Sequence, residues 1–190
     1  SSQTLRAETT RQHLIQFIRH STALPASLFE RFWLIPIHRF AELAQLFPAS
    51  ENHHHSHAGG LLDHSLEASC YAARLRQSYL FPPDAAPEDQ AAQSERWTTV
   101  IIYAALRHDL GKLITDIEVE NFSGKRWFPW HGPLTQPYRF RYLPQRDYLR
   151  HPAAAVLLLT QLIPPESLDW LAADTAALST LLHCLNGQYQ

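Results

Sequence analysis

The feature that most constrains the fold is an apolar run near the middle of the chain, RWTTVIIYAALRH at residues 96–108. As a helix, this run carries apolar side chains over most of its surface, and such a helix is stable only when its neighbours bury it. The run falls short of the roughly 20 apolar residues that a membrane-spanning helix needs. It therefore predicts a buried central helix that ends at Gly111, a residue type common where helices stop.

Most of the remaining chain carries the apolar spacing of helices that bury one face. Pro152 fits the first turn of one such helix, and Asp174 is a suitable N-cap for the last. Helices are predicted over residues 9–20, 27–35, the interval between Pro36 and Pro48, 61–80, 152–163, and from Asp174 to about Gly187. The predicted class is all-α, a helical bundle in a single domain over residues 1–190.

Two segments lack helical spacing. Residues 81–95 (FPPDAAPEDQAAQSE) contain three prolines and few apolar side chains, which predicts a surface loop. Residues 115–150 contain four prolines and many aromatic side chains without clear periodicity, and a long irregular loop insertion is expected there. A loop of that length in a compact domain is usually functional or poorly ordered. Ile117–Val119 is the best weak candidate for a strand.

Composition narrows the functional classes. The formal net charge is −2, so the chain has no global basic footprint for nucleic acid. The cysteines, Cys70 and Cys184, suggest no disulfide framework. No signal peptide or membrane span is visible, so a cytoplasmic location without membrane insertion is expected. The chain contains no methionine, which indicates a piece of a longer protein, and 12 histidines, which is unusually many.

His108 and Asp109 end the apolar run and precede Gly111 and Lys112. Where a backbone leaves helical geometry, two adjacent side chains can reach one ion, and an imidazole nitrogen with a carboxylate oxygen suits Fe, Mn, Zn or Ni better than Ca. A bare His-Asp pair is more often an exposed helix cap, whereas HDxGK after a buried run is more specific. Lys112 fits either a contact to a substrate phosphate or a solvated helix end.

His64 lies in GGLLDHSLEAS, on a predicted helix whose inward side is small and apolar. A histidine there needs a partner, either a metal ion or, more commonly, a backbone carbonyl. One histidine on this helix and the pair His108-Asp109 on another resemble the start of the HD superfamily signature. That signature belongs to metal-dependent phosphohydrolases, so the resemblance implies an HD-type helical bundle.

The longer segment FPASENHHHSHAGGLLDHSLEAS resembles the relaxases of integrative conjugative elements, the MobH class, whose N-terminal domain is described as a helicase or relaxase domain. That class has a GGLLxHSLE segment, an HDLGK segment and a triple-histidine signature. The triple-histidine signature is matched by His53, His54 and His55, and HDLGK by His108–Lys112. The resemblance runs from about residue 10 to the chain end.

The resemblance implies a divalent metal (Mn, Fe, Zn, Ni or Mg) and a set of ligands. Two-metal members of the HD superfamily add histidines, which LRHP and STLLHCLNG match. The expected metal ligands are His64, His108, Asp109, His151 and His183. The signature closes with a distal aspartate, and Asp169 and Asp174 come too early in the chain to supply it. That ligand is therefore expected beyond residue 190, and a chain without it is expected to hold metal weakly.

Further histidines fit positions around the metal rather than on it. They are His53, His54 and His55 from the triple signature, and His131 from WHGPL. We favour His54 and His55 as the pair facing the pocket, because a very similar HHxxxGGLLxH pattern occurs in HD-type exoribonucleases. His131 fits either an approach to the metal or a contact that orients a phosphate.

Residues 121–150 combine six basic side chains with one acid, Asp147, and many aromatic rings. Single-stranded nucleic acid requires this combination, because basic groups neutralise phosphates and aromatic rings stack on bases. The alternative is that the aromatic rings anchor a long loop and the arginines are solvated. The candidate nucleic-acid-binding residues are Lys125, Arg126, Trp127, Trp130, Arg139 and Arg141.

Three functions fit these residues. The first, implied by the resemblance, is a metal-dependent phosphodiesterase acting on DNA at a transfer origin, with His108, Asp109 and Lys112 as catalytic residues and the metal lowering the pKa of bound water. The second is a nucleotide or RNA phosphohydrolase using the same site. The third is an HD domain without hydrolase activity that binds DNA or the conjugation machinery. A tyrosine nucleophile also stays open, with Tyr71, Tyr103 and Tyr138 available.

Overall fold

The computed structural model describes residues 2–77, 86–146 and 150–186, with the backbone alone for residues 2–7, 91 and 92. The helices are α1 (Ser2–His20), α2 (Ala26–Phe29), the π-helical turn η1 (Glu30–Leu34), α3 (Ile35–Ala44), α4 (Gly60–Gln77), α5 (Pro87–Leu110), α6 (Lys112–Thr115), the short η2 (Pro129–His131), α7 (His151–Leu162), α8 (Pro165–Ala172) and α9 (Thr175–Leu185). The fold is mostly helical, as predicted. Within the described ranges, no helix combines the length and apolarity needed to cross a membrane.

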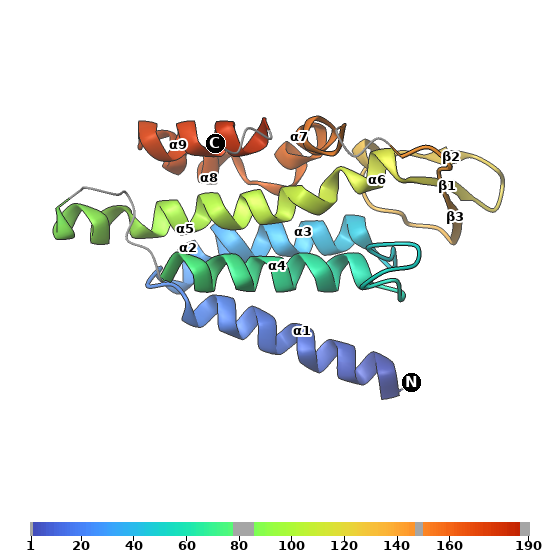
Figure 1. The fold of residues 1–190 in the computed structure, drawn as a ribbon, viewed down its shortest axis with the longest axis horizontal. Coiled ribbons are helices and arrows are strands. Elements are labelled where there is room, and N and C mark those ends of the chain that lie inside the picture. The colour runs from blue at the N-terminus through green and yellow to red at the C-terminus, as the bar shows by residue number, and fades with distance from the viewer. Residues whose placement is uncertain (1, 78–85, 147–149, 187–190) are drawn as a thin grey trace.

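Helix α5 is the centre of the bundle. Figure 1 shows it between α3 and α4 on one side and α7 to α9 on the other, with α1 outermost beyond α4. Its buried side chains include Val100, Ile102, Tyr103, Leu106 and Leu110. The Tyr103 hydroxyl donates to the Phe32 carbonyl at 2.6 Å, and the Trp33 indole N–H donates to the Thr99 hydroxyl at 2.7 Å. The prediction of a buried central helix is confirmed.

Helix α5 begins at Pro87, so the predicted surface loop over residues 81–95 is wrong from that residue onward. Proline suits the first helical turn because its missing N–H would have no partner there. The carboxylates of Glu88 and Asp89 in the same turn favour a helix start, since they face the positive end of the helix dipole. These three residues favour the start of a helix there even though the segment has few apolar side chains. Residues 81–85 lie outside the described part of the chain.

A small antiparallel sheet occupies much of the segment predicted to be irregular. Its strands are β1 (Ile117–Asn121), β2 (Arg126–Trp127) and β3 (Tyr138–Tyr142), in the order β2-β1-β3. In β1, Ile117 and Val119 are buried while Glu118 and Glu120 lie opposite arginines of β3. This two-residue alternation is the pattern of a half-buried strand. The predicted strand at Ile117–Val119 is thus confirmed. The prediction of an irregular insertion over residues 115–150 is wrong where these three strands lie.

Gly111 lies between α5 and α6 in a right-handed helical conformation, with φ −60° and ψ −29°. The helix ends here as predicted, because Gly111 is the C-cap of α5, but it does so without the left-handed conformation common at such ends. Glycine is needed for space, because a Cβ atom at this position would lie 2.3 Å from the carbonyl oxygen of His151. The close approach holds the start of α7 against the end of α5.

Asp174 caps α9 as predicted. Its carboxylate accepts hydrogen bonds from the backbone N–H groups of Ala176 and Ala177 at 3.0 and 3.1 Å. Asp174→Ala is expected to lower the free energy of unfolding by about 1 kcal/mol, since it leaves both groups without this acceptor. Chemical denaturation measures the loss, and Asp174→Asn, which keeps a cap, should stay close to wild type. Equal stability of the alanine and asparagine variants would contradict the capping role.

Candidate metal centre

Two helix ends bring together, at one end of the bundle, three residues that could hold a metal ion. His64 lies near the start of α4, and His108 and Asp109 lie in the last turn of α5. Figure 1 shows these two helix ends beside each other, next to the small sheet. One donor atom from each of the three residues lies within 4.8 Å of the other two. The cluster is formed by side chains 45 residues apart in the sequence, as the His64–Asp109 contact shows.

Asp109 is the buried centre of this cluster. Its Oδ2 atom lies 2.6 Å from Nδ1 of His64 and accepts a hydrogen bond from the Ser65 hydroxyl at 2.7 Å. Its Oδ1 atom lies 2.8 Å from the ammonium of Lys112 and 3.3 Å from Nδ1 of His108. Burial acts to raise the pKa of Asp109, but the hydrogen bonds from His108 and His64 and the charge of Lys112 outweigh it and hold that pKa well below its usual range. Asp109 is therefore ionised at neutral pH.

The negative charge of Asp109 sets the hydrogen-bonding role of His64. An ionised carboxylate can only accept hydrogen bonds, so His64 donates through Nδ1, and in a neutral imidazole that leaves the lone pair on Nε2. Carboxylates orient metal-binding imidazoles in this way. The side chains of His64 and His108 are 34% and 65% exposed, so an ion or substrate can reach the cluster from solvent. Two imidazoles and a carboxylate suit a divalent transition metal better than Ca.

Lys112 neutralises the buried carboxylate. Its ammonium contacts Asp109, donates to the carbonyl oxygen of Ala49 at 3.4 Å, and is only 19% exposed as a side chain. The structure therefore shows an ion-paired lysine rather than the solvated one that the sequence leaves open. The bond to Ala49 also ties α6 to the loop that precedes α4.

The two additional histidines expected to be ligands, His151 and His183, lie outside the three-residue cluster. His151, at the start of α7, contacts Asp116 at 2.7 Å through Nε2. Burial acts to raise the pKa of Asp116, but hydrogen bonds from His151 and Thr115 lower it below its usual range. Sequence reasoning missed Asp116 as a partner of His151. His183 is exposed on α9.

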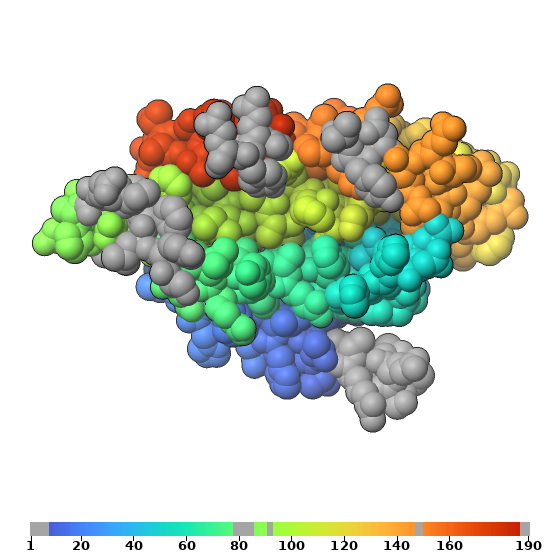
Figure 2. All heavy atoms as spheres, viewed as in Figure 1, coloured from blue at the N-terminus to red at the C-terminus, as the bar shows by residue number. Residues whose placement is uncertain are grey.

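The histidine loop, residues 48–59, covers the start of α4. His53 and His54 are exposed, whereas the His55 side chain is 19% exposed and contacts Glu67 at 2.9 Å. His57 contacts Asp63 at 2.8 Å. Figure 2 shows this loop, in teal, against the orange segment that follows β3, where Arg146 pairs with Glu51. The structure thus separates the histidines that the sequence groups together.

Arg11 of α1 anchors the other side of the histidine loop. Its guanidinium contacts both carboxylate oxygens of Asp63, at 2.5 and 3.2 Å, and the carbonyl oxygen of Gly59 at 3.4 Å. Burial acts to raise the pKa of Asp63, but hydrogen bonds from Arg11 and His57 lower it below its usual range. The outermost helix therefore helps to fix the residue next to His64.

The basic residues of the candidate nucleic-acid surface fall into two groups. Arg139 contacts Glu120 at 2.5 Å, and Arg141 contacts Glu118 at 2.8 Å. Arg126 also approaches Glu118, at 3.5 Å. Both glutamates lie just before the window of residues 121–150, so the sequence comparison of six basic residues with one acid overstates the positive charge. Cross-strand pairing offsets much of the charge of these arginines.

The remaining candidates gather beside the β1–β2 turn. Lys125 and His131 are exposed and line a pocket of about 240 Å³ with Arg126 and Trp127. Next to it, the rings of Phe128 and Trp130 stack at 4.7 Å with an 8° angle between their planes. Trp130 is 44% exposed, so part of its ring faces solvent. Trp127 donates its indole N–H to the Gly132 carbonyl and packs on Phe47, so it anchors the segment.

A comparison with known families assigns this chain to one of them. The family model TraI_2, described as a putative helicase, matches residues 1–190. The chain belongs to this family. The match supports the prediction that the chain is a conjugative TraI-like domain. No curated protein is similar enough to the chain to count as a match.

The three tyrosines of this TraI_2 domain that the sequence leaves open as nucleophiles differ in access. Tyr103 is fully buried in the core, and burial raises the pKa of its hydroxyl. The Tyr138 hydroxyl accepts a hydrogen bond from the backbone N–H of Leu46 at 3.4 Å. Tyr71 is 68% exposed on α4. Tyr103 therefore cannot reach a substrate while the domain is folded.

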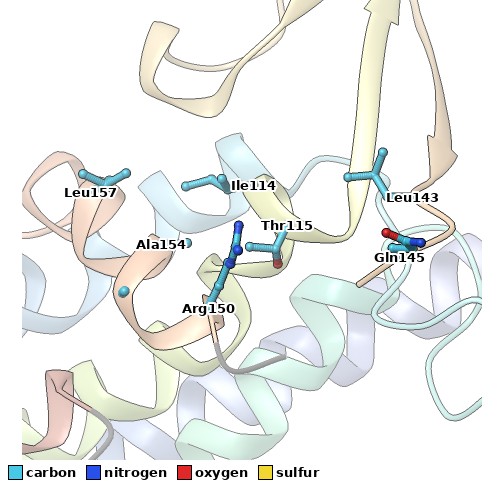
Figure 3. Close-up of a pocket in the computed structure, with 8 residues that line it drawn as sticks. Ile114, Thr115, Leu143, Gln145, Arg150, Ala154 and Leu157 are labelled. Carbon is cyan, nitrogen blue, oxygen red and sulfur yellow. The ribbon is translucent and has the colours of Figure 1, made fainter. Parts of the chain in front are cut away.

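Figure 3 shows a pocket of about 530 Å³ in the TraI_2 domain between α6, α7 and the segment after β3. Its lining is mainly apolar and includes Ile114, Leu143 and Leu157, together with Arg150. None of the three clustered residues lines it. The candidate chemistry therefore lies at the exposed end of α4 and α5, outside this pocket.

Proposed function

We propose that this TraI_2 domain is a divalent-metal-dependent phosphohydrolase of the HD type, acting on DNA phosphodiesters as part of a MobH-class relaxase. The observation that carries the proposal is the convergence of His64, His108 and Asp109 from two helix ends. A structural ion pair between Asp109 and Lys112 alone would not require two partly exposed imidazoles beside it. The resemblance to conjugative relaxases suggests DNA as the substrate class, and the family match is consistent with it.

The three clustered residues are proposed to hold the ion. A divalent metal there would polarise a phosphate oxygen and make bound water more acidic. Asp109 supplies the charge of the site, and Ser65 and Lys112 hold its carboxylate in place. The exposed edge of His108 leaves room for a phosphodiester to approach. The glycines of this chain do not form the GxxxxGK(S/T) loop that binds nucleotide phosphates, so the proposal rests on the His–Asp cluster.

Hydrolysis assays test the proposal. The wild-type chain with Mn²⁺, Fe²⁺, Ni²⁺, Zn²⁺ or Mg²⁺ is expected to cleave a chromogenic phosphodiester or a single-stranded oligonucleotide, and a chelator should remove the activity. His108→Ala is the sharpest variant because its exposed side chain can be removed with little effect on packing. Activity that survives both chelation and His108→Ala would overturn the proposal. Competition between DNA, RNA and free nucleotides separates the DNA enzyme from a nucleotide or RNA phosphohydrolase.

A second candidate, a DNA-binding domain without hydrolase activity, is favoured by one observation. Both oxygens of Asp109 already have partners within the chain, which a purely structural cluster would also show. A domain of this kind would bind single-stranded DNA equally well with metal and with chelator, and would cleave none. The same assays therefore decide between the two functions.

We further propose that single-stranded DNA contacts the β1–β2 turn. Lys125→Ala is expected to reduce the slope of log affinity against log salt by roughly 0.7 for each phosphate that the variant no longer neutralises. Trp130→Ala should weaken binding by about 1–3 kcal/mol per stacked base and leave the slope unchanged. Arg139→Ala is the matched control, since Glu120 already neutralises that arginine. A larger slope change in Arg139→Ala than in Lys125→Ala would contradict this placement.

A further inference from the structure

A second surface pocket adjoins the basic pocket beside the β1–β2 turn. Its volume is about 660 Å³, and apolar and aromatic side chains, among them Leu46, Phe122 and Phe140, form much of its lining. The basic pocket, which Lys125 lines, has a volume of about 240 Å³. The two pockets share residues 134–136 as a common wall, so a single extended ligand can occupy both. We call the larger one the aromatic pocket.

The aromatic pocket gathers apolar side chains that face solvent. Phe122 is 72% exposed, Leu46 is 64% exposed, and Phe140 is also exposed. Single exposed apolar side chains are common, whereas several at one place mark a binding site more often. This group therefore indicates a ligand with apolar faces.

The backbone holds Leu46 in its exposed position. Its N–H donates to the Tyr138 hydroxyl at 3.4 Å, and its carbonyl oxygen accepts a hydrogen bond from the N–H of Gly59 at 3.0 Å. The preceding residue, Gln45, has a φ of +47°, which residues other than glycine rarely adopt, and its side-chain amide donates to the Leu134 carbonyl at 3.1 Å. Strained residues that the surrounding structure holds in place often mark functional sites.

The chemistry of the two pockets matches a ligand that alternates negative charges with flat apolar groups. Of the described residues that line them, none is acidic, whereas Lys125 and Arg126 are basic. The Thr135 hydroxyl and the Gln136 amide add hydrogen-bonding groups to the shared wall. Single-stranded nucleic acid has this alternation, since its phosphates bind basic groups and its bases stack on aromatic rings.

We propose that the aromatic pocket is a base-binding subsite, in which Phe122 stacks on a base of single-stranded DNA while Lys125 neutralises a neighbouring phosphate. This inference rests on the proposed action on DNA. Trp130 does not line the aromatic pocket, so the two rings take different bases. Ala58 of the histidine loop borders the pocket, and Figure 1 shows that loop and the small sheet at the same end of the bundle. A strand bound here therefore lies at the end of the molecule that carries the His–Asp cluster.

Fluorescence anisotropy with two labelled strands of equal length tests the inference. One strand is an oligothymidylate, the other has the same sugar-phosphate backbone without bases, and a chelator prevents cleavage. Phe122→Ala is expected to weaken binding of the oligothymidylate about 5–150-fold, the effect of losing one stacked base. Binding of the base-free strand and the salt slope should not change. Lys125→Ala should weaken binding of both strands.

Three further variants separate stacking from general apolar contact. Phe122→Trp keeps a flat ring and should bind the oligothymidylate at least as tightly as the wild type does. Phe122→Leu keeps apolar bulk without a ring and should bind as weakly as Phe122→Ala. Leu157→Ala removes a side chain that is 62% exposed on α7 and lines neither pocket, so it should leave binding unchanged.

The outcomes distinguish this inference from the proposals on which it rests. If Phe122→Ala, folded by thermal melting, binds the oligothymidylate as the wild type does while Lys125→Ala binds it more weakly, the base-binding subsite is wrong and the phosphate contact stands. If Phe122→Ala leaves DNA affinity unchanged but dissociates an oligomer in analytical ultracentrifugation, the pocket is a contact between copies of the chain. A wild type that binds neither strand would overturn the proposed action on DNA as well. Because the titrations require neither metal nor cleavage, their result stands apart from the hydrolysis assays.

Discussion

Asp109→Asn is expected to reduce divalent-metal affinity by more than about 100-fold, beyond the 10–100-fold typical of residues that only orient a ligand. The substitution removes the only carboxylate of the three-residue cluster and leaves the Lys112 ammonium without its partner. Removing one member of a buried ion pair also costs about 3–5 kcal/mol of stability. Calorimetric metal titration and chemical denaturation measure the two effects separately.

His108→Ala separates metal binding from stability. The His108 side chain is 65% exposed and makes only a long contact to Asp109, at 3.3 Å. Its removal should weaken metal binding and change the free energy of unfolding by less than about 0.5 kcal/mol, as for most surface substitutions. If both variants lose stability in proportion to metal affinity, the cluster is structural and the ligand assignment is wrong.

Gly60→Ala is expected to disrupt the histidine loop. The added Cβ atom would lie 1.9 Å from the carbonyl oxygen of His55, far inside any tolerated contact, and backbone atoms cannot yield as a flexible side chain can. We expect a loss of about 3 kcal/mol, the upper end for overpacking. Thermal or chemical unfolding measures it.

Gly124→Ala is the control for Gly60→Ala. Gly124 has a φ of +80° but nothing within 4 Å of the Cβ position, so alanine there costs only the backbone strain of about 1–2 kcal/mol. A loss at position 60 no larger than at position 124 would contradict the close packing of the loop on α4. The two variants together separate backbone strain from steric conflict.

The sequence predicts the helical bundle well where a single physical signal dominates. The apolar run at 96–108 requires burial and becomes the core of α5, and Asp174 caps α9 through two backbone N–H groups. The prediction fails where a weak signal competes with prolines. Pro87 has the composition of a loop residue, yet it starts a helix because the first helical turn does not use the N–H that proline lacks.

Contacts between side chains far apart in the sequence could not be predicted from residue spacing. Asp116 pairs with His151, and Glu67 pairs with His55, but each carboxylate reads alone as an ordinary polar residue. Gly111 is predicted correctly as the end of a helix, but its close contact with the backbone of α7 could not be predicted. Such pairings depend on tertiary packing, which residue spacing does not encode.

Metal titration of the wild-type chain beside His64→Ala, His108→Ala and Asp109→Asn tests the central claim most directly. The account predicts saturable binding of a divalent transition metal by the wild type, and a large loss of affinity in each of the three variants while each remains folded. Binding by the wild type that is unchanged in all three folded variants would contradict it.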